Sequence, residues 1–201
     1  MGRPRSPLRA WRDPFLEDMV ETPASSPARR TPRRRGSVAQ WEAMTEDEAL
    51  AALRGDDPAH AARAEAALWE MWCRSGIPDV DVLLRDGIAA MERQDLREAE
   101  ACFARIIGQA PQFVEGWNKR ATVRFLAENF EGSIADCRET LARNPHHFGA
   151  LSGQGLCHLA LGQYREAAVL FRRALAVHPH LTGARHNLAL ALAEAVKSNG
   201  R

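Results

Sequence analysis

Residues 145–179 read PHHFGALSGQGLCHLALGQYREAAVLFRRALAVHP, and they are the part of the sequence that is most informative about the fold. Two helical segments joined by a tight turn lie between Pro145 and Pro179. Proline ends a helix because it lacks an N–H group and clashes with the preceding turn. Gly155 is small enough for the first helix to approach the second closely, and Tyr164 opens the second helix. The stretch therefore predicts a helical hairpin that is closed by proline.

The same pattern recurs every 34 residues. Six positions keep this spacing: Pro111, Pro145 and Pro179; Gly87, Ala121, Gly155 and Ala189; Leu96, Phe130 and Tyr164; Ala99, Ser133 and Ala167; Phe103, Cys137 and Phe171; Ile107, Leu141 and Leu175. Six independent positions in register indicate a true repeat. A single hairpin of this kind cannot bury its apolar face, so consecutive hairpins must stack on one another.

A period of 34 residues with these small, aromatic and proline positions resembles the tetratricopeptide repeat family. The resemblance covers residues 80–197 and implies an all-α fold, a right-handed α-solenoid of helix-turn-helix repeats. It places repeats at residues 80–113, 114–147 and 148–181, followed by a C-terminal capping helix and tail at residues 182–201. The repeats are also similar to those of small tetratricopeptide proteins of bacteria and plant plastids.

The first 42 residues differ in composition from the rest. They hold nine arginines against five acidic residues, and residues 21–36 contain no large apolar side chain. Such a segment cannot bury enough surface to offset its ordering entropy, so we expect a disordered arm rich in Arg, Pro and Ser over residues 1–42. Within the arm, Trp11–Val20 is compatible with a short amphipathic helix, and Ser37 follows a pair of arginines, as a basophilic kinase site requires.

A helical pair is predicted between the arm and the repeats, at residues 43–79. Thr45 and Glu48 have the spacing of a capping box, and Asp57-Pro58 is typical of the start of a second helix. The pair has the length of a repeat without its small and aromatic positions. We interpret it as a degenerate repeat or a cap.

Motifs that are typical of enzymes are absent from the sequence, which has no GxxxxGK[ST], no GxSxG and no CxxC. The four cysteines suit buried free thiols of a reducing compartment. The pairs His146-His147 and His178 with His180 flank the inter-repeat prolines, so we predict that they lie in exposed turns without the further ligands that a zinc site requires. We therefore expect no catalytic residues, no cofactor and no metal.

The first helices of the repeats depart from the family pattern at one position. Asp86, Arg120 and Gln154 stand where an apolar residue is usual. They form either a structural polar ladder, in which Asp86 and Arg120 of adjacent helices pair, or a row that faces a ligand. The sequence leaves both interpretations open.

The resemblance implies that the first helices line a concave groove that binds peptides. The side chains that it places in this groove are Leu84, Ile88, Asn118, Thr122, Phe125, Ser152 and Leu156. Chaperone-binding members of the family hold a C-terminal carboxylate with Lys, Asn and Arg side chains. The corresponding positions of this chain are Leu84, Ile88, Lys119, Gly149 and Gly153, so we expect no carboxylate clamp.

We interpret the chain as a non-enzymatic scaffold that binds a peptide or helix of an unidentified partner protein in this groove. One alternative is a self-inhibited adaptor whose segment Trp11–Val20 occupies the groove. Another is a nucleic-acid-associated protein that uses the arginine-rich arm, although a net charge of +1 argues against it.

The expected state and location of the chain follow from its composition. No apolar run approaches the roughly 18 residues that a membrane span needs, so we expect no membrane partner. We also expect the chain to be a monomer. We expect a cytoplasmic location, with a chloroplast or another organelle as the alternative. The arm is rich in Arg, Ser and Pro as transit peptides are, but it also carries acidic residues, which transit peptides lack.

Overall fold

The computed structural model describes residues 44–199. Its helices are α2 (Glu46–Leu53), α3 (Pro58–Trp72), α4 (Pro78–Glu92), α5 (Leu96–Gln109), α6 (Val114–Leu126), α7 (Phe130–Arg143), α8 (Phe148–Ala160), α9 (Tyr164–Val177) and α10 (Thr182–Asn199). No strand occurs in this range, which confirms the prediction of an all-α helical repeat fold. The arm predicted for residues 1–42, with Trp11–Val20 and Ser37, lies outside the described residues.

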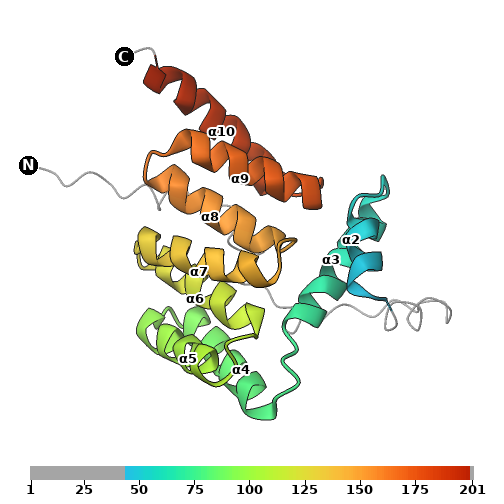
Figure 1. Ribbon diagram of the computed structural model, residues 1–201, viewed down its shortest axis with the longest axis vertical. Coiled ribbons are helices and arrows are strands. Elements are labelled where there is room, and N and C mark those ends of the chain that lie inside the picture. Colours follow the sequence, from blue (N-terminus) through green and yellow to red (C-terminus); the bar gives the residue numbers. More distant parts are fainter. Residues whose placement is uncertain (1–43, 200–201) are drawn as a thin grey trace, which may run out of the picture.

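Helices α4 to α10 form a stack in which each helix packs against the next (Figure 1). The hairpins are α4–α5, α6–α7 and α8–α9, and α10 covers the last of them. Each second helix begins at the leucine or aromatic position of the repeat and ends two residues before its proline; in α7 these residues are Phe130, Arg143 and Pro145. The helix bounds thus follow the 34-residue period.

The small position in each first helix lies against a side chain of the second helix. A Cβ atom added to Gly87 would lie 2.5 Å from Cε1 of Phe103, and one added to Gly155 would lie 2.8 Å from Cε1 of Phe171. Both phenylalanines are fully buried. The two helices of a hairpin thus touch where the sequence predicted their close approach.

Helices α2 and α3 begin as the sequence predicted. Thr45 and Glu48 form the capping box, with the Thr45 hydroxyl accepting a hydrogen bond from the Glu48 N–H. The Asp57 carboxylate accepts a hydrogen bond from the N–H of Ala59 at the start of α3. These local signals define the two helices but not where the pair packs.

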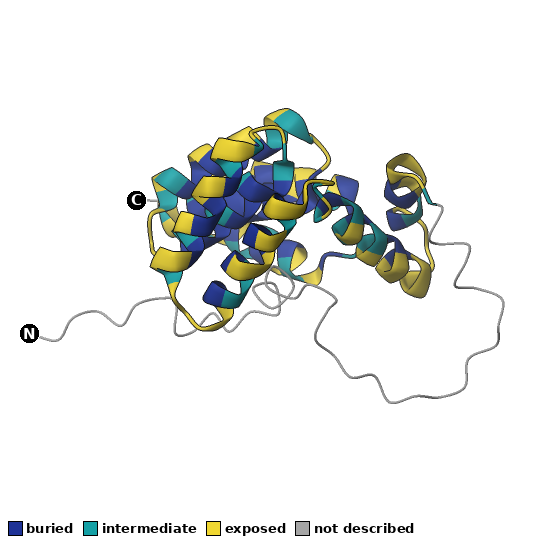
Figure 2. Ribbon diagram, turned by 90° about the horizontal axis from the view of Figure 1, so that it is seen from below, coloured by how far each residue is buried: buried dark blue, intermediate teal, exposed yellow. Residues whose placement is uncertain are grey.

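The α2–α3 hairpin stands beside the stack rather than in line with it (Figures 1 and 2). Its buried side chains belong to the same hydrophobic core as residues of α8, α9 and α10; examples are Leu53, Leu68, Phe148, Leu151 and Leu181. The first repeat, although it follows the hairpin directly in sequence, has a separate core around Val80, Leu84 and Phe103. The hairpin therefore packs on the far part of the repeat array.

This packing corrects the prediction that the inter-repeat histidines lie in exposed turns for two of the four, whereas His146 is exposed and His180 is half-buried. His147 is completely buried and His178 is 2% exposed, because the α2–α3 hairpin covers these turns. His178 contacts Glu65 of α3, and His180 donates a hydrogen bond to the carbonyl of Gly55 between α2 and α3. The burial of His147 and His178 could not be predicted from the repeat pattern, because the hairpin that covers them lies outside the repeats.

Within the described range, no helix has both the length and the apolar composition that a membrane span requires.

Candidate functional site

The residues predicted to line the groove lie on the first helices α4, α6 and α8. Ile88 is half-buried, whereas the other six are buried: Leu84, Asn118, Thr122, Phe125, Ser152 and Leu156. Leu84 is part of the separate core of the first repeat. The predicted set is thus divided between the core of the first repeat and the contact between the second and third repeats.

Four of the predicted residues meet around one small cavity between α6, α7 and α8. Asn118, Thr122, Phe125 and Leu156 line it, together with Gly153 and side chains of α7. Its volume of about 10 Å³ is close to the smallest that admits one water molecule. The cavity therefore admits at most one water-sized group and no peptide side chain.

Two polar atoms on the first helices are buried without a hydrogen-bond partner among the described residues. They are Oδ1 of Asn118, which lines the cavity, and Oγ of Ser152, one repeat further along the chain. A buried polar atom without a partner costs about 1–3 kcal/mol relative to one that is hydrogen-bonded. An N–H or O–H group that reached either atom would remove this cost, but in this structure Ser152 is completely buried and Asn118 is 3% exposed.

A buried ionic group lies at the start of α6, next to Asn118. The Glu115 carboxylate is 3.4 Å from Nζ of Lys119 and 3.1 Å from Nε2 of His147, and it accepts a hydrogen bond of 2.9 Å from Nδ2 of Asn118. His147 Nδ1 accepts the N–H of Ala150 and so caps α8, which places the ring proton on Nε2, facing Glu115.

The environment of Glu115 sets its protonation state. Burial by itself would raise the pKa of this carboxyl group, but Lys119 and the hydrogen bonds from His147 and Asn118 outweigh burial and lower the pKa. The carboxylate is therefore ionised at neutral pH and occupied by three partners. Sequence reasoning missed this group, since Glu115 and His147 are 32 residues apart and do not repeat with the 34-residue period.

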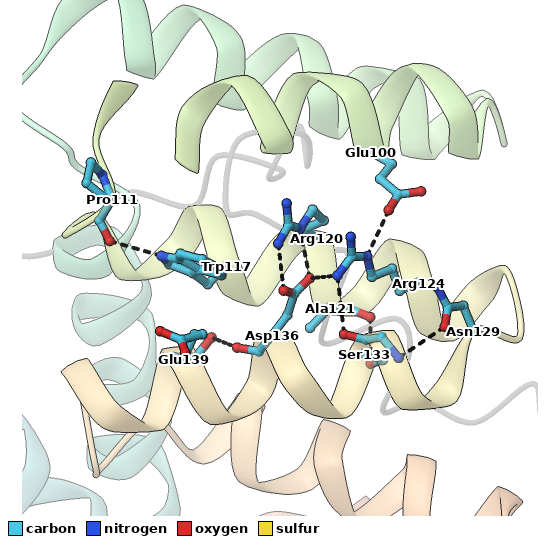
Figure 3. Close-up of polar contacts among 12 residues, drawn as sticks. Glu100, Pro111, Trp117, Arg120, Ala121, Arg124, Asn129, Ser133, Asp136 and Glu139 are labelled. Atoms are coloured by element: carbon cyan, nitrogen blue, oxygen red, sulfur yellow. Dashed lines mark hydrogen bonds and ion pairs between the residues drawn. The ribbon is translucent and has the colours of Figure 1, made fainter. Parts of the chain in front are cut away.

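Of the polar residues Asp86, Arg120 and Gln154 on the first helices, Arg120 has a structural role (Figure 3). Its guanidinium donates to both oxygens of Asp136 on α7, at 2.8 and 2.7 Å. Arg124, one turn later, bridges Asp136 at 3.0 Å and Glu100 of α5 at 2.8 Å. The expected pair of Asp86 with Arg120 was wrong: Asp86 is exposed on α4, and Arg120 reaches the second helix of its own hairpin instead.

An aromatic ring extends the same cluster. The guanidinium groups of Arg120 and Arg143 lie over the Trp117 ring, 5.2 and 4.9 Å from its centroid. The Trp117 Nε1 donates a hydrogen bond to the carbonyl of Pro111 (Figure 3). Arg143 Nε donates to the same carbonyl. These contacts join α6 and α7 to the turn after α5, which is a structural role.

The described residues offer little that could support covalent chemistry. Burial raises the pKa of the Cys73 thiol to about 12 and that of Cys157 to about 11, and it holds that of Cys137 well above its ordinary value. Such thiols stay protonated at neutral pH and are poor nucleophiles. Between residues 44 and 199, no group of three or more His, Cys, Asp or Glu side chains is arranged to hold a metal ion.

Comparison with known proteins agrees with the geometry. A family model described as "Tetratricopeptide repeat" matches residues 84–147 and 127–181. A TPR repeat-containing protein of Rhizobium etli is 29% identical over 126 residues, which are 63% of this chain and 62% of that protein. The chain thus matches less than two thirds of the length of this relative.

Solved structures show the same fold. The first TPR of Spaghetti (RPAP3), bound to the HSP90 peptide SRMEEVD, is similar with a TM-score of 0.58 and 23% identity, covering 59% of this chain and 94% of that one. The Sgt2 TPR domain from Aspergillus fumigatus is similar with a TM-score of 0.60 and 19% identity, covering 62% and 84%. At these identities the likeness concerns the fold.

Proposed function

This chain belongs to the tetratricopeptide repeat family, and on that ground we propose that it is a non-enzymatic scaffold that binds a partner protein. The bound element is a peptide or helix that lies along the first helices of the second and third repeats. The observation that carries the proposal is the pair of buried, unpartnered polar atoms, Asn118 Oδ1 and Ser152 Oγ, one repeat apart on α6 and α8. Both residues are buried in this structure, so backbone N–H groups of an extended peptide reach these atoms only after neighbouring side chains move aside.

The proposed ligand is an internal segment rather than a chain terminus. A similar solved structure, the first TPR of Spaghetti, is bound to an HSP90 peptide. Of the positions of this chain that correspond to a carboxylate clamp, only Lys119 carries a basic side chain, and it is buried against Glu115. Because Lys119 is already paired with the carboxylate of Glu115, it is poorly placed to bind the C-terminal carboxylate of a peptide. We therefore propose recognition by apolar contacts and amide hydrogen bonds.

Ser152→Ala tests the proposal with a result that a structural role would not give. Since Ser152 Oγ has no partner within the described part of the chain, its removal should leave the melting temperature unchanged or slightly higher. If the hydroxyl binds a peptide, the same change should weaken binding by about tenfold, which corresponds to about 1.4 kcal/mol.

The measurement uses 12-residue peptides selected from a random display library on the full chain. Their affinities for the wild type, for Ser152→Ala and for the exposed control Ser198→Ala are then compared by fluorescence polarisation. Selected peptides that bind Ser152→Ala as tightly as the wild type would refute the proposed face. So would a library from which no peptide is selected.

The two other candidate functions depend on residues 1–42, which precede the described range. Deletion of these residues separates them from the main proposal. An increase in peptide affinity would support self-inhibition by Trp11–Val20, and the loss of a salt-sensitive affinity for nucleic acid would support the nucleic-acid function. A cytoplasmic location, with a chloroplast or another organelle as the alternative, is likewise proposed from the arm and is tested with a C-terminal fluorescent fusion.

A further inference from the structure

Three side chains on one face of α3 contact the repeats, in addition to Glu46 of α2, the carbonyl of Gly55 and buried leucines such as Leu68. Glu65, Trp69 and Trp72 follow one another at spacings of four and three residues, which places them on the same side of a helix. All three contact residues of the repeats. Much of the rest of α3 is alanine, and Leu68 is a further large side chain, fully buried in the shared core.

Trp69 fits a place on α8 that a glycine leaves open. A Cβ atom added to Gly149 would lie 2.8 Å from Cη2 of Trp69. The indole meets His147 and Phe148 edge-on, with ring centroids 5.5 and 5.3 Å apart, and Nζ of Lys119 lies 5.6 Å from its ring. Any larger residue at position 149 would displace this indole.

Trp72 and Glu65 complete the contact. The Trp72 ring stacks on His147 at 4.5 Å with an angle of 23° between the planes. The Glu65 carboxylate lies 3.2 Å from Nε2 of His178, which is the turn residue one repeat further along. We name the group of Lys119, His147, Phe148, Gly149 and His178 the α3 site.

The form of this contact is that of a bound ligand rather than of a further repeat. Two large aromatic side chains fill a prepared surface, as anchor residues do at protein interfaces, and Leu53 and Leu68 add buried apolar contacts. The hairpin is connected to the stack only by the short segment 73–77, at one of its ends. Release of the hairpin would therefore break side-chain contacts but no backbone element of the repeats.

We propose that the α2–α3 hairpin is a cis ligand of the α3 site, and that a partner helix of the same chemistry exchanges with it. The site recognises a helix with two aromatic side chains three residues apart and an acidic residue four positions before the first, the pattern E-x-x-x-W-x-x-W of residues 65–72. The proposal deepens the function proposed above by naming one class of partner. Two residues of the site, Lys119 and Gly149, stand at clamp positions of the groove, but the site uses neither Asn118 nor Ser152, so either proposal can fail alone.

A labelled peptide of residues 44–74 tests the exchange on the full chain. In the wild type the tethered hairpin competes at a high effective concentration, so the peptide should bind weakly. In the double variant Trp69→Ala, Trp72→Ala the site is vacated, and the peptide should bind at least about tenfold more tightly than it binds the wild type. Adding Gly149→Leu to the double variant should abolish this gain, whereas adding Gly108→Leu, at an open position of α5, should not.

Three outcomes would overturn the proposal. The first is that the peptide binds the wild type and the double variant with equal affinity. The second is that it does not bind a double variant whose circular dichroism shows folded repeats. The third is that it still binds after Gly149→Leu is added to the double variant. None of these variants touches Asn118 or Ser152, so a failure here leaves the peptide-face test unaffected.

Hydrogen exchange of the wild-type chain provides a second measurement that needs no variant. A cis ligand opens locally, so the amides of α3 should exchange faster than those of α8. If α3 and α8 exchange together at the rate of global unfolding, the hairpin is a permanent part of the core and the proposal is wrong.

Discussion

At the scale of single residues, the fold depends on positions where no atom can be added. Gly155 is the clearest, since a Cβ atom there would lie 2.8 Å from Phe171 and that ring is fully buried. A flexible surface side chain could move aside, but Phe171 is held by the core around it. The packing of a whole hairpin therefore depends on the lack of one methyl group.

Gly155→Leu should lower the free energy of unfolding by about 1–3 kcal/mol or more, because α8 and α9 must separate to admit the side chain. Gly108→Leu is the matched control. No atom lies within 4 Å of a Cβ at Gly108, so this change should be neutral or stabilising by about 0.5–1 kcal/mol through helix propensity. Urea unfolding followed by circular dichroism measures both. Equal midpoints for Gly155→Leu and the wild type would show that the register is wrong.

Glu115 gives the stability of the chain a dependence on pH. The pKa of its carboxyl group is lower in the folded chain than its ordinary value of 4.5, so the unfolded chain binds more protons in the window below 4.5. The stabilisation is complete above that value and is lost as the pH falls through the lowered pKa. Acidification from pH 7 to pH 3 should therefore weaken the fold in part through this one residue.

Glu115→Gln should cost about 3–5 kcal/mol at pH 7, because it leaves Lys119 as a buried charge without its carboxylate partner. The variant should also lose less stability than the wild type between pH 5 and pH 3, since the titrating group is gone. Denaturant unfolding at several pH values measures both effects, with the exposed Glu166→Gln as control. An acid transition of the same size in Glu115→Gln would contradict the assignment.

At the scale of elements, charged side chains join the helices of neighbouring hairpins. Asp136 of α7 holds Arg120 and Arg124 of α6, and Arg124 continues to Glu100 of α5. Three helices thus meet around one carboxylate, in the place where the family pattern has an apolar residue. The arginines keep this contact specific, because a carboxylate matches the planar guanidinium with two hydrogen bonds.

Asp136→Ala should lower the free energy of unfolding by about 2–4 kcal/mol, since it leaves two part-buried guanidinium groups without this acceptor. Glu139→Ala, one turn later on the same helix, breaks the half-exposed pair with Arg143 and should cost less than about 1 kcal/mol. Thermal unfolding of the two variants compares them directly. A smaller loss for Asp136→Ala than for Glu139→Ala would exclude a stabilising role for the cluster.

The helices themselves could be predicted from the sequence, because their signals are local or periodic. Phe130 opens α7, Pro145 follows its end, and Thr45 caps α2, and each of these acts within a few residues. The position of α2–α3 could not be predicted, because it depends on contacts such as Glu46 with Asn144, 98 residues apart. The surroundings of Asn118 could not be predicted for the same reason. Its place in the repeat indicates that it lies on a first helix, but Glu115, which accepts its hydrogen bond, has no counterpart in the other repeats.

At the scale of the whole molecule, residues 44–199 contain two hydrophobic cores rather than one continuous core. The first repeat has its own core, while α2–α3, the third repeat and α10 share the other. In a linear array each repeat is stabilised by its neighbours in sequence. Here the N-terminal hairpin adds a contact across the array, so the C-terminal half gains a neighbour that the first repeat lacks.

Two phenylalanines at equivalent repeat positions test this division. Phe103 and Phe171 are both fully buried, and Phe→Ala at either should cost about 3–5 kcal/mol. Phe103→Ala should raise hydrogen exchange mainly in α4 and α5, because its core is confined to the first repeat and its edge. Phe171→Ala should raise exchange in α8 to α10 and also in α2 and α3, which precede it by about a hundred residues. If hydrogen exchange rises uniformly along the chain in both variants, the chain has one cooperative core. If Phe171→Ala leaves the protection of the α2–α3 amides unchanged, the third repeat does not stabilise the hairpin.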